Sequence, residues 1–170
     1  DQVVWQVARL ANGSMRDGLS LLDRVFAAAD NEEVVTIARL EPLLGLPPQE
    51  RIDQLIDALA TGDVAASQTH TARPVGGGLA QDQVFEALIE RLRLLMLVAA
   101  CGQESPLVEV GREEREALAR QAESFDSAGL VYMIALCEQG YQAGRRSVNA
   151  RALLDATIVR LALAEKMADV

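Results

Sequence analysis

The apolar residues of this 170-residue chain recur at the spacing of an α-helix almost from end to end. Side chains three and four positions apart share one face of a helix, whereas a half-buried strand needs apolar and polar residues in alternation. No segment alternates for long enough to predict a strand. The periodicity therefore predicts an all-α chain whose consecutive helices each bury an apolar face.

Helix-ending and helix-starting residues divide the first part of the chain. A first helix carries Val3, Val7 and Leu10 on one face and ends at Asn12-Gly13, a pair that suits the left-handed conformation found after helices. Ser14 is a good N-cap for a second helix, which should run to about Ala29. The apolar stripe of this second helix consists of Met15, Leu19, Leu22 and Phe26.

A domain boundary is predicted near residue 45. A short helix should begin at the N-cap Thr36 and end at Gly45, and Pro42 should distort or shorten it. The stiff segment Leu46-Pro47-Pro48 follows and suits the start of another helix. The sequence therefore predicts one domain over residues 1–45 and a second over residues 46–170. The inward-facing residues of the short helix are expected to be Ile37, Leu40, Leu43 and Leu44.

The second domain is predicted to be a bundle of helices. The longest, from Ala80 to Cys101, has apolar residues on more than one face and should lie nearly enclosed at the centre. The segment Pro74-Val75-Gly76-Gly77-Gly78 precedes it, but no strand leads into this segment and no Gly-Lys-Ser/Thr follows, so a turn is favoured over a phosphate loop. Four runs are expected on the other helices: the apolar run Ile52 to Leu59, the polar run from the N-cap Asp63 to His70, the charged, solvated run Arg112 to Arg120, and a run that ends around Gly140 to Gly144. Asp126 or Ser127 should cap the helix of this last run, and a final helix should start at Asn149.

The charge balance disfavours direct contact with nucleic acid. Sixteen Lys and Arg residues against 25 Asp and Glu residues give a formal net charge of −9, and such a surface repels a phosphate backbone. The longest uncharged run, from Ser127 to Cys137, is far shorter than the roughly 18 residues of a membrane helix. No secretory signal is recognisable at the start. We therefore expect a cytoplasmic protein without a membrane span.

Residues for catalysis or metal binding do not gather in any recognisable motif. Cys101 and Cys137 lack the spacing of a zinc site, and both are predicted to be reduced and buried. His70 has no second His or Cys nearby and is expected to be solvated on a helix face. No Ser or Cys has a base at a recognisable spacing. The chain taken alone is thus predicted to have no catalytic residue, no metal and no bound cofactor, and to show no ATP hydrolysis.

Arg16 departs from the local pattern. It lies two positions after the cap Ser14, where a cation costs a helix roughly 0.3–1 kcal/mol. The same position suits phosphate, because backbone N–H groups and the guanidinium donors can point at one anion. From spacing alone, phosphate binding and a surface ion pair with Asp17 or Asp23 both remain open.

The segment from Gly13 to Arg24 resembles the sensor-2 helix of AAA+ clamp-loader ATPases, in the version found in the gamma/tau subunits of bacterial DNA polymerase III. The family pattern there is Gly-Ser-Met/Leu-Arg-Asp-Ala-Leu-Ser-Leu-Leu-Asp-Gln. This sequence departs from it only at Gly18, in place of Ala, and at Arg24, in place of Gln. Neither change falls on Arg16.

Two further segments are similar to the same family. Val35 to Leu46 is similar to the last helix of the AAA+ lid, apart from Pro42, and Arg151 to Leu161 is similar to a helix of the collar domain. The resemblance thus implies that residues 1–45 are the end of the helical lid. It also implies that residues 46–170 are the collar, the helical bundle through which clamp-loader subunits assemble.

The resemblance implies roles as well. Arg16 would be the sensor-2 arginine, which contacts the γ-phosphate of ATP in the intact protein. An upstream module would bind the ATP with Mg²⁺ and carry a structural Zn²⁺, and the parent would be an ATPase subunit of the DNA polymerase III holoenzyme. Its partners would be other loader subunits, the sliding clamp and primed DNA. Two alternatives stay open: a free-standing helical adaptor, and the equivalent region of another AAA+ clamp-loader or repair ATPase.

Overall fold

The computed structural model describes residues 2–11, 13–28, 35–76 and 79–168, and throughout these ranges the regular elements are α-helices. The predicted all-α class is confirmed. The packing of the helices divides the chain into two compact units, Asp1–Pro48 and Gln49–Val170, each of which is described by itself. No helix in the described ranges is long and apolar enough to cross a membrane.

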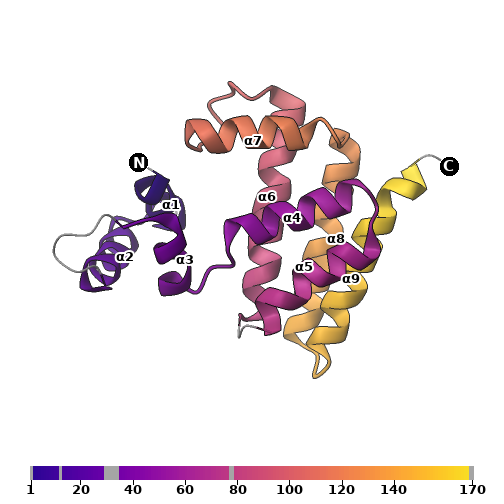
Figure 1. Cartoon of the computed structure of the whole chain (residues 1–170), viewed down its shortest axis with the longest axis horizontal. Coiled ribbons are helices and arrows are strands. Elements are labelled where there is room, and N and C mark those ends of the chain that lie inside the picture. Colours follow the sequence, from indigo (N-terminus) through magenta and orange to yellow (C-terminus); the bar gives the residue numbers. More distant parts are fainter. Residues whose placement is uncertain (1, 12, 29–34, 77–78, 169–170) are drawn as a thin grey trace. The chain divides into compact units, whose positions relative to one another are not determined.

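The first unit contains α1 (Gln2–Ala11), α2 (Met15–Ala28) and α3 (Ile37–Leu44), all in the indigo to purple part of Figure 1. Gly13 turns the chain between α1 and α2 with φ at 79°. Ser14 caps α2, because its Oγ accepts a hydrogen bond from the backbone N–H of Asp17 at 3.3 Å. The predicted junction at residues 11–15 is therefore confirmed, apart from Asn12, which lies outside the described residues. The core of the unit consists of Val7, Val25 and Leu40, with Val3, Leu21, Leu22, Val35, Ile37 and Leu44 partly buried around them.

Three of the four residues of the predicted apolar stripe of α2 lie outside the face that the helix buries, and the fourth, Leu22, is partly buried against the core. Met15, Leu19 and Phe26 are exposed to 78%, 55% and 68%. The helix instead packs against α1 and α3 through a neighbouring face that includes Val25. The reason lies at Gly18, where a Cβ would come within 3.3 Å of the Ala11 Cβ, so that α1 approaches α2 along the glycine side.

The helix α3 continues through Pro42 and ends where predicted, at Gly45 with φ at 68°. Leu40 is fully buried, but Leu43, expected to face inward, is 38% exposed. Arg24 of α2 donates a hydrogen bond from Nη2 to the Leu43 carbonyl at 2.9 Å. This contact satisfies one of the carbonyl groups that a helix leaves unbonded at its C-terminal end.

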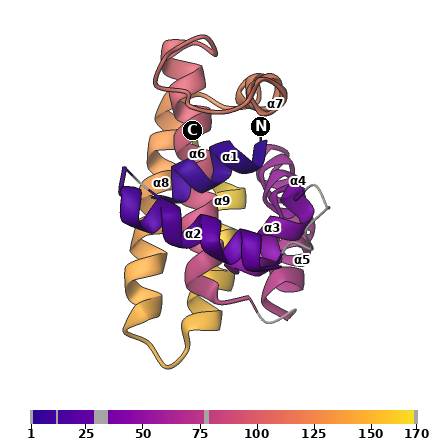
Figure 2. The same ribbon diagram turned by 90° about the vertical axis from the view of Figure 1, so that its left-hand side faces the viewer.

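The second unit contains the helices α4 (Gln49–Ala60), α5 (Val64–Gly76), α6 (Gln81–Cys101), α7 (Arg112–Ala122), α8 (Ser127–Arg145) and α9 (Ala150–Ala168). The central place predicted for the longest helix is confirmed, since α6 contacts every other described helix of the unit. Its most extensive contact is with α8, which packs against α9 in turn. Figures 1 and 2 show α7 across the end of the bundle where α6 ends, and the turn between α8 and α9 at the opposite end.

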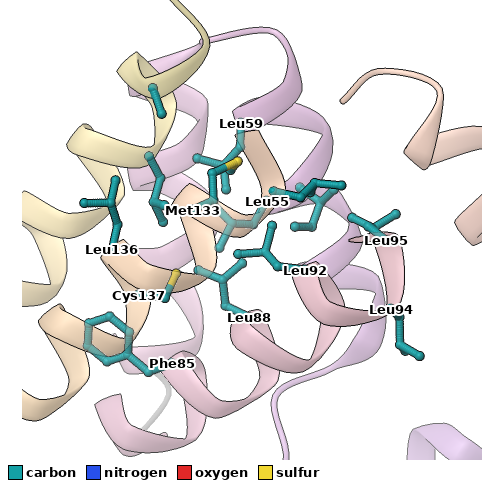
Figure 3. Packing of buried hydrophobic residues seen from close by; sticks show 14 of the residues in the cluster. Leu55, Leu59, Phe85, Leu88, Leu92, Leu94, Leu95, Met133, Leu136 and Cys137 are labelled. Atoms are coloured by element: carbon teal, nitrogen blue, oxygen red, sulfur yellow. The ribbon is translucent and has the colours of Figure 1, made fainter. Parts of the chain in front are cut away.

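Leucine side chains of α6 form the centre of this unit's core, with apolar residues of α4 and α8 around them (Figure 3). The predicted N-caps form, since a carboxylate oxygen of Asp63 accepts from the Ala66 N–H at 2.9 Å and one of Asp126 from the Gly129 N–H at 2.7 Å. The labelled core residues in Figure 3, each at most 2% exposed, are Leu55, Leu59, Phe85, Leu88, Leu92, Leu94, Leu95, Met133, Leu136 and Cys137.

The helix α8 ends at Arg145, one residue past the predicted range of Gly140 to Gly144. Gly140 lies inside this helix, at a close contact: a Cβ there would lie 2.3 Å from the Thr157 Oγ1 of α9 and 3.1 Å from the Phe85 ring of α6. The helix α5 runs further than predicted, because it extends into the segment 74–78 predicted to be a turn and ends at Gly76. Gly77 and Gly78 lie outside the described residues.

Three predictions about burial are wrong. Cys137 is buried as expected, and burial raises the pKa of its thiol to about 12, but Cys101 is exposed because it is the last residue of α6. His70 is only partly exposed, and its Nδ1 is buried. The segment 112–120 is not a fully solvated helix, since Leu118 is completely buried where α7 packs on α6.

Candidate functional site

Arg16 is exposed in the first turn of α2. The structure holds this turn in place on both sides, since Ser14 caps it and the Ser20 hydroxyl donates to the Arg16 carbonyl at 2.9 Å. In the part of the chain that the structure describes, neither Asp17 nor Asp23 forms an ion pair with the Arg16 guanidinium. The surface ion pair that the spacing left open is therefore not observed.

This geometry suits an anion. A helix start presents backbone N–H groups without partners inside the helix, together with the positive end of the helix dipole. In α2 the Ser14 hydroxyl takes up one of these groups, that of Asp17. The planar guanidinium of Arg16 adds donors that match phosphate oxygens. The first turn of α2 can therefore bind a phosphate group chemically.

A second polar site lies inside the second unit and was not predicted. Arg91 of α6 is 3% exposed, and its Nε and Nη2 donate to the Gln121 Oε1 at 3.1 and 2.7 Å. The same guanidinium forms ion pairs with Asp53 of α4 at 2.8 Å and with Glu114 of α7 at 3.5 Å. Gln121 also donates to a carboxylate oxygen of Asp57 at 2.8 Å.

The Arg91 cluster, defined as these five residues, joins three helices: α4, α6 and α7. Burial raises the pKa of Asp53, although the nearby charge of Arg91 lowers it. A buried ion pair of this kind fastens helices in one arrangement and contributes little as a recognition surface. The sequence did contain a sign of it, because Leu88 and Leu95 flank Arg91 at helical spacing and place it on the buried face.

Within the described ranges, no three His, Cys, Asp or Glu residues lie close enough together to hold a metal ion. His70, Cys101 and Cys137, whose spacing did not suggest a metal site, belong to no such group. Arg16 was predicted from the sequence as a site residue, and its exposed guanidinium is available to bind an anion.

Two family models match the chain. The model of DNA polymerase III subunits gamma and tau, domain III, matches residues 35–170, and that of the DNA polymerase III clamp loader subunit, ATPase lid domain, matches residues 1–31. The boundary between the two models falls before α3, whereas the packing divides the chain after Pro48. The predicted boundary after residue 45 lies between these two positions.

Curated relatives are similar along nearly the whole chain. Proteins named DNA polymerase III subunit gamma/tau from Mycobacterium bovis and from two strains of Mycobacterium tuberculosis are each 30% identical over 165 residues, which is 96% of this chain. The aligned region is 28% of the length of those relatives.

Proposed function

Because the chain belongs to the family of DNA polymerase III subunits gamma and tau, we propose that it is the lid end and collar of a clamp-loader subunit. The observation that carries this proposal is the match of domain III over residues 35–170, directly after the match of the lid. The two alternatives, a free-standing adaptor and a region of another AAA+ ATPase, fit less well with a match to two consecutive domains of one subunit.

In this proposal the two units do different work. The second unit is the collar, which binds other loader subunits, and the first unit carries Arg16 to a phosphate of ATP. The exposed guanidinium and its position in the first turn of α2 support contact with that phosphate. ATP and Mg²⁺ would be bound chiefly by a module outside this chain, which would also carry the structural Zn²⁺. ATP, when bound to the loader, would supply the free energy for opening the sliding clamp.

The proposed partners follow from the same assembly. They are other clamp-loader subunits through the collar, with the sliding clamp and primed DNA reached through the whole loader in the cytoplasm. The net charge of −9 supports an indirect contact with DNA rather than a direct one.

Removing Arg16 is expected to impair the ATPase without unfolding the protein. In the intact subunit, Arg16→Ala should lower DNA-stimulated ATP hydrolysis by about tenfold, the equivalent of about 1.4 kcal/mol of lost transition-state stabilisation. Arg16→Lys should restore little, because a single ammonium does not reproduce the planar fork. Steady-state hydrolysis in the assembled loader measures the effect, and thermal unfolding checks the fold.

An exposed arginine of the second unit, Arg120, provides the control. Arg120→Ala removes the same charge and side chain from a position with no proposed contact to nucleotide, so its ATP hydrolysis should match that of the unmodified protein. If Arg16→Ala hydrolyses ATP as fast as the unmodified protein, the assignment of Arg16 to the nucleotide site is wrong.

Deleting the second unit is expected to abolish assembly. A subunit that lacks residues 49–170 should no longer associate with itself or with other loader subunits, because the proposed contacts lie on the second unit. Sedimentation velocity of the mixed subunits measures the loss. If the shortened subunit still enters the loader, the collar assignment is wrong.

A further inference from the structure

Residues 102–122, named the α7 flap, lie at one end of the second unit. The α7 flap consists of the loop that follows α6 and the whole of α7, which lies across the end of the bundle (Figures 1 and 2). The chain enters it at Gly102, whose φ of 83° lies in the left-handed region that favours glycine. Among the described helices, α7 packs extensively only on α6, whereas α8 packs on both α6 and α9.

The α7 flap is held together by contacts of its own. Arg115, on the helix, donates hydrogen bonds to two carbonyl groups of the loop, that of Gln103 at 3.2 Å and that of Val108 at 3.1 Å. The same guanidinium pairs with the Glu104 carboxylate at 3.6 Å. Because these contacts join the loop to the helix, we expect the two parts to move as one piece.

Apolar contacts between the α7 flap and the rest of the unit are few. Six of the eleven residues of α7 are charged. Of the 23 described buried residues that form the core cluster of the unit, the α7 flap supplies four: Val108, Val110, Leu118 and Ala122. A recess of about 440 Å³ is lined entirely by residues between 103 and 116, so the α7 flap is loosely packed against itself. Few buried apolar contacts and a low packing density are properties of segments that open locally.

Polar contacts between the α7 flap and the bundle meet at the Arg91 cluster. Arg91 pairs with Glu114 of α7 at 3.5 Å and donates to Gln121 at 2.7 Å. Gln121 donates in turn to the Asp57 carboxylate of α4 at 2.8 Å. Opening breaks these contacts together, but water then hydrates the charges and returns part of the free energy that their burial cost. A polar cluster therefore releases a helix more readily than apolar packing of the same area does.

We propose that the α7 flap opens as one piece while the other helices of the second unit stay folded, and that the Arg91 cluster is the latch that holds it closed. In the open state the four apolar residues of the α7 flap leave the core, whereas the contacts of α8 with α6 and with α9 remain. One end of the unit thus rearranges without unfolding of the rest. This motion does not depend on the collar function.

Native-state hydrogen exchange of the 170-residue chain tests the opening. The backbone amides of residues 116–121 in α7 are compared with those of residues 133–137 in α8, each relative to the rate of an unstructured chain. In the unmodified protein the α7 amides should exchange at least a hundredfold faster. Gln121→Ala removes one side of the latch and should speed exchange in α7 at least tenfold further. Arg120→Ala, at an exposed position of the same helix, is the control and should leave exchange in α7 unchanged.

A variant of the bundle separates local opening from unfolding of the whole unit. Gly140→Ala overfills the contact of α8 with α9 and α6, which stays formed when the α7 flap opens. It should therefore speed exchange in α8 at least tenfold and leave exchange in α7 unchanged. Gln121→Ala should speed exchange in both helices, because it destabilises the closed state from which each opening starts.

Three results would overturn the proposal. Equal exchange in α7 and α8 of the unmodified protein, or faster exchange in α7 of Gly140→Ala, would show that the α7 flap opens only when the whole unit unfolds. Unchanged exchange in α7 of Gln121→Ala would show that the Arg91 cluster is not the latch.

Discussion

Arg91→Ala is expected to lower the free energy of unfolding by about 3–5 kcal/mol, the cost of breaking a buried ion pair. The substitution leaves Asp53 close to other acidic residues in a partly buried site and removes both hydrogen bonds to Gln121. It also releases the ion pair with Glu114 that ties α7 to α6. Urea unfolding followed by circular dichroism measures the change.

The neighbouring Arg93 is the matched control. It lies on the same helix, is 46% exposed and pairs with Glu90 at 2.9 Å. Exposed pairs contribute at most about 1 kcal/mol, so Arg93→Ala should have a small effect. The double variant Arg91→Met with Asp53→Asn should recover part of the lost stability, since it removes both charges. If Arg91→Ala and Arg93→Ala cost the same, the cluster does not fasten the three helices.

Gly140→Ala is expected to lower the free energy of unfolding by about 2–3 kcal/mol, because the added methyl group overfills a packed contact. It would lie 2.3 Å from the Thr157 Oγ1, whose hydroxyl donates to the Leu153 carbonyl at 2.8 Å. It would also lie 3.1 Å from the Phe85 ring. Thermal unfolding of the variant measures the loss.

Gly144, one turn further along α8, provides the opposite expectation. The nearest atom to an added Cβ there is 4.0 Å away, so Gly144→Ala should stabilise the protein by about 0.5–1 kcal/mol through helix propensity. Adding Thr157→Ala to Gly140→Ala should relieve part of the clash. Equal effects of alanine at the two glycines would show that α8 and α9 are not in close contact at Gly140.

The sequence predicted the helices better than their contacts. Periodicity and capping residues located α6 and the N-caps Asp63 and Asp126, because both depend on residues close together in the chain. The role of Gly140 was not predictable, because this glycine lies inside α8 at the approach of another helix and does not mark the helix end. The buried face of α2 was partly misjudged, because the close approach of α1 to α2 at Gly18 depends on a contact between two helices.

The candidate sites, like the helices, were predictable only where they depend on residues close together in the chain. Arg16 was recognisable, because its position relative to Ser14 is local and the surrounding residues resemble one family's pattern. The Arg91 cluster was missed, because Asp53 and Gln121 lie far from Arg91 in the sequence and only the fold brings them together. Periodicity marks a position as buried, but it does not tell which side chain on another helix can compensate a buried charge.

The hydrogen bond from Arg24 to the Leu43 carbonyl has a mechanical consequence. It joins the helix that carries Arg16 to the end of the helix that leads into Leu46-Pro47-Pro48. Val25 and Leu40, both buried, connect the same two helices through the core. We therefore expect α2 and α3 to move together when a ligand at Arg16 displaces α2.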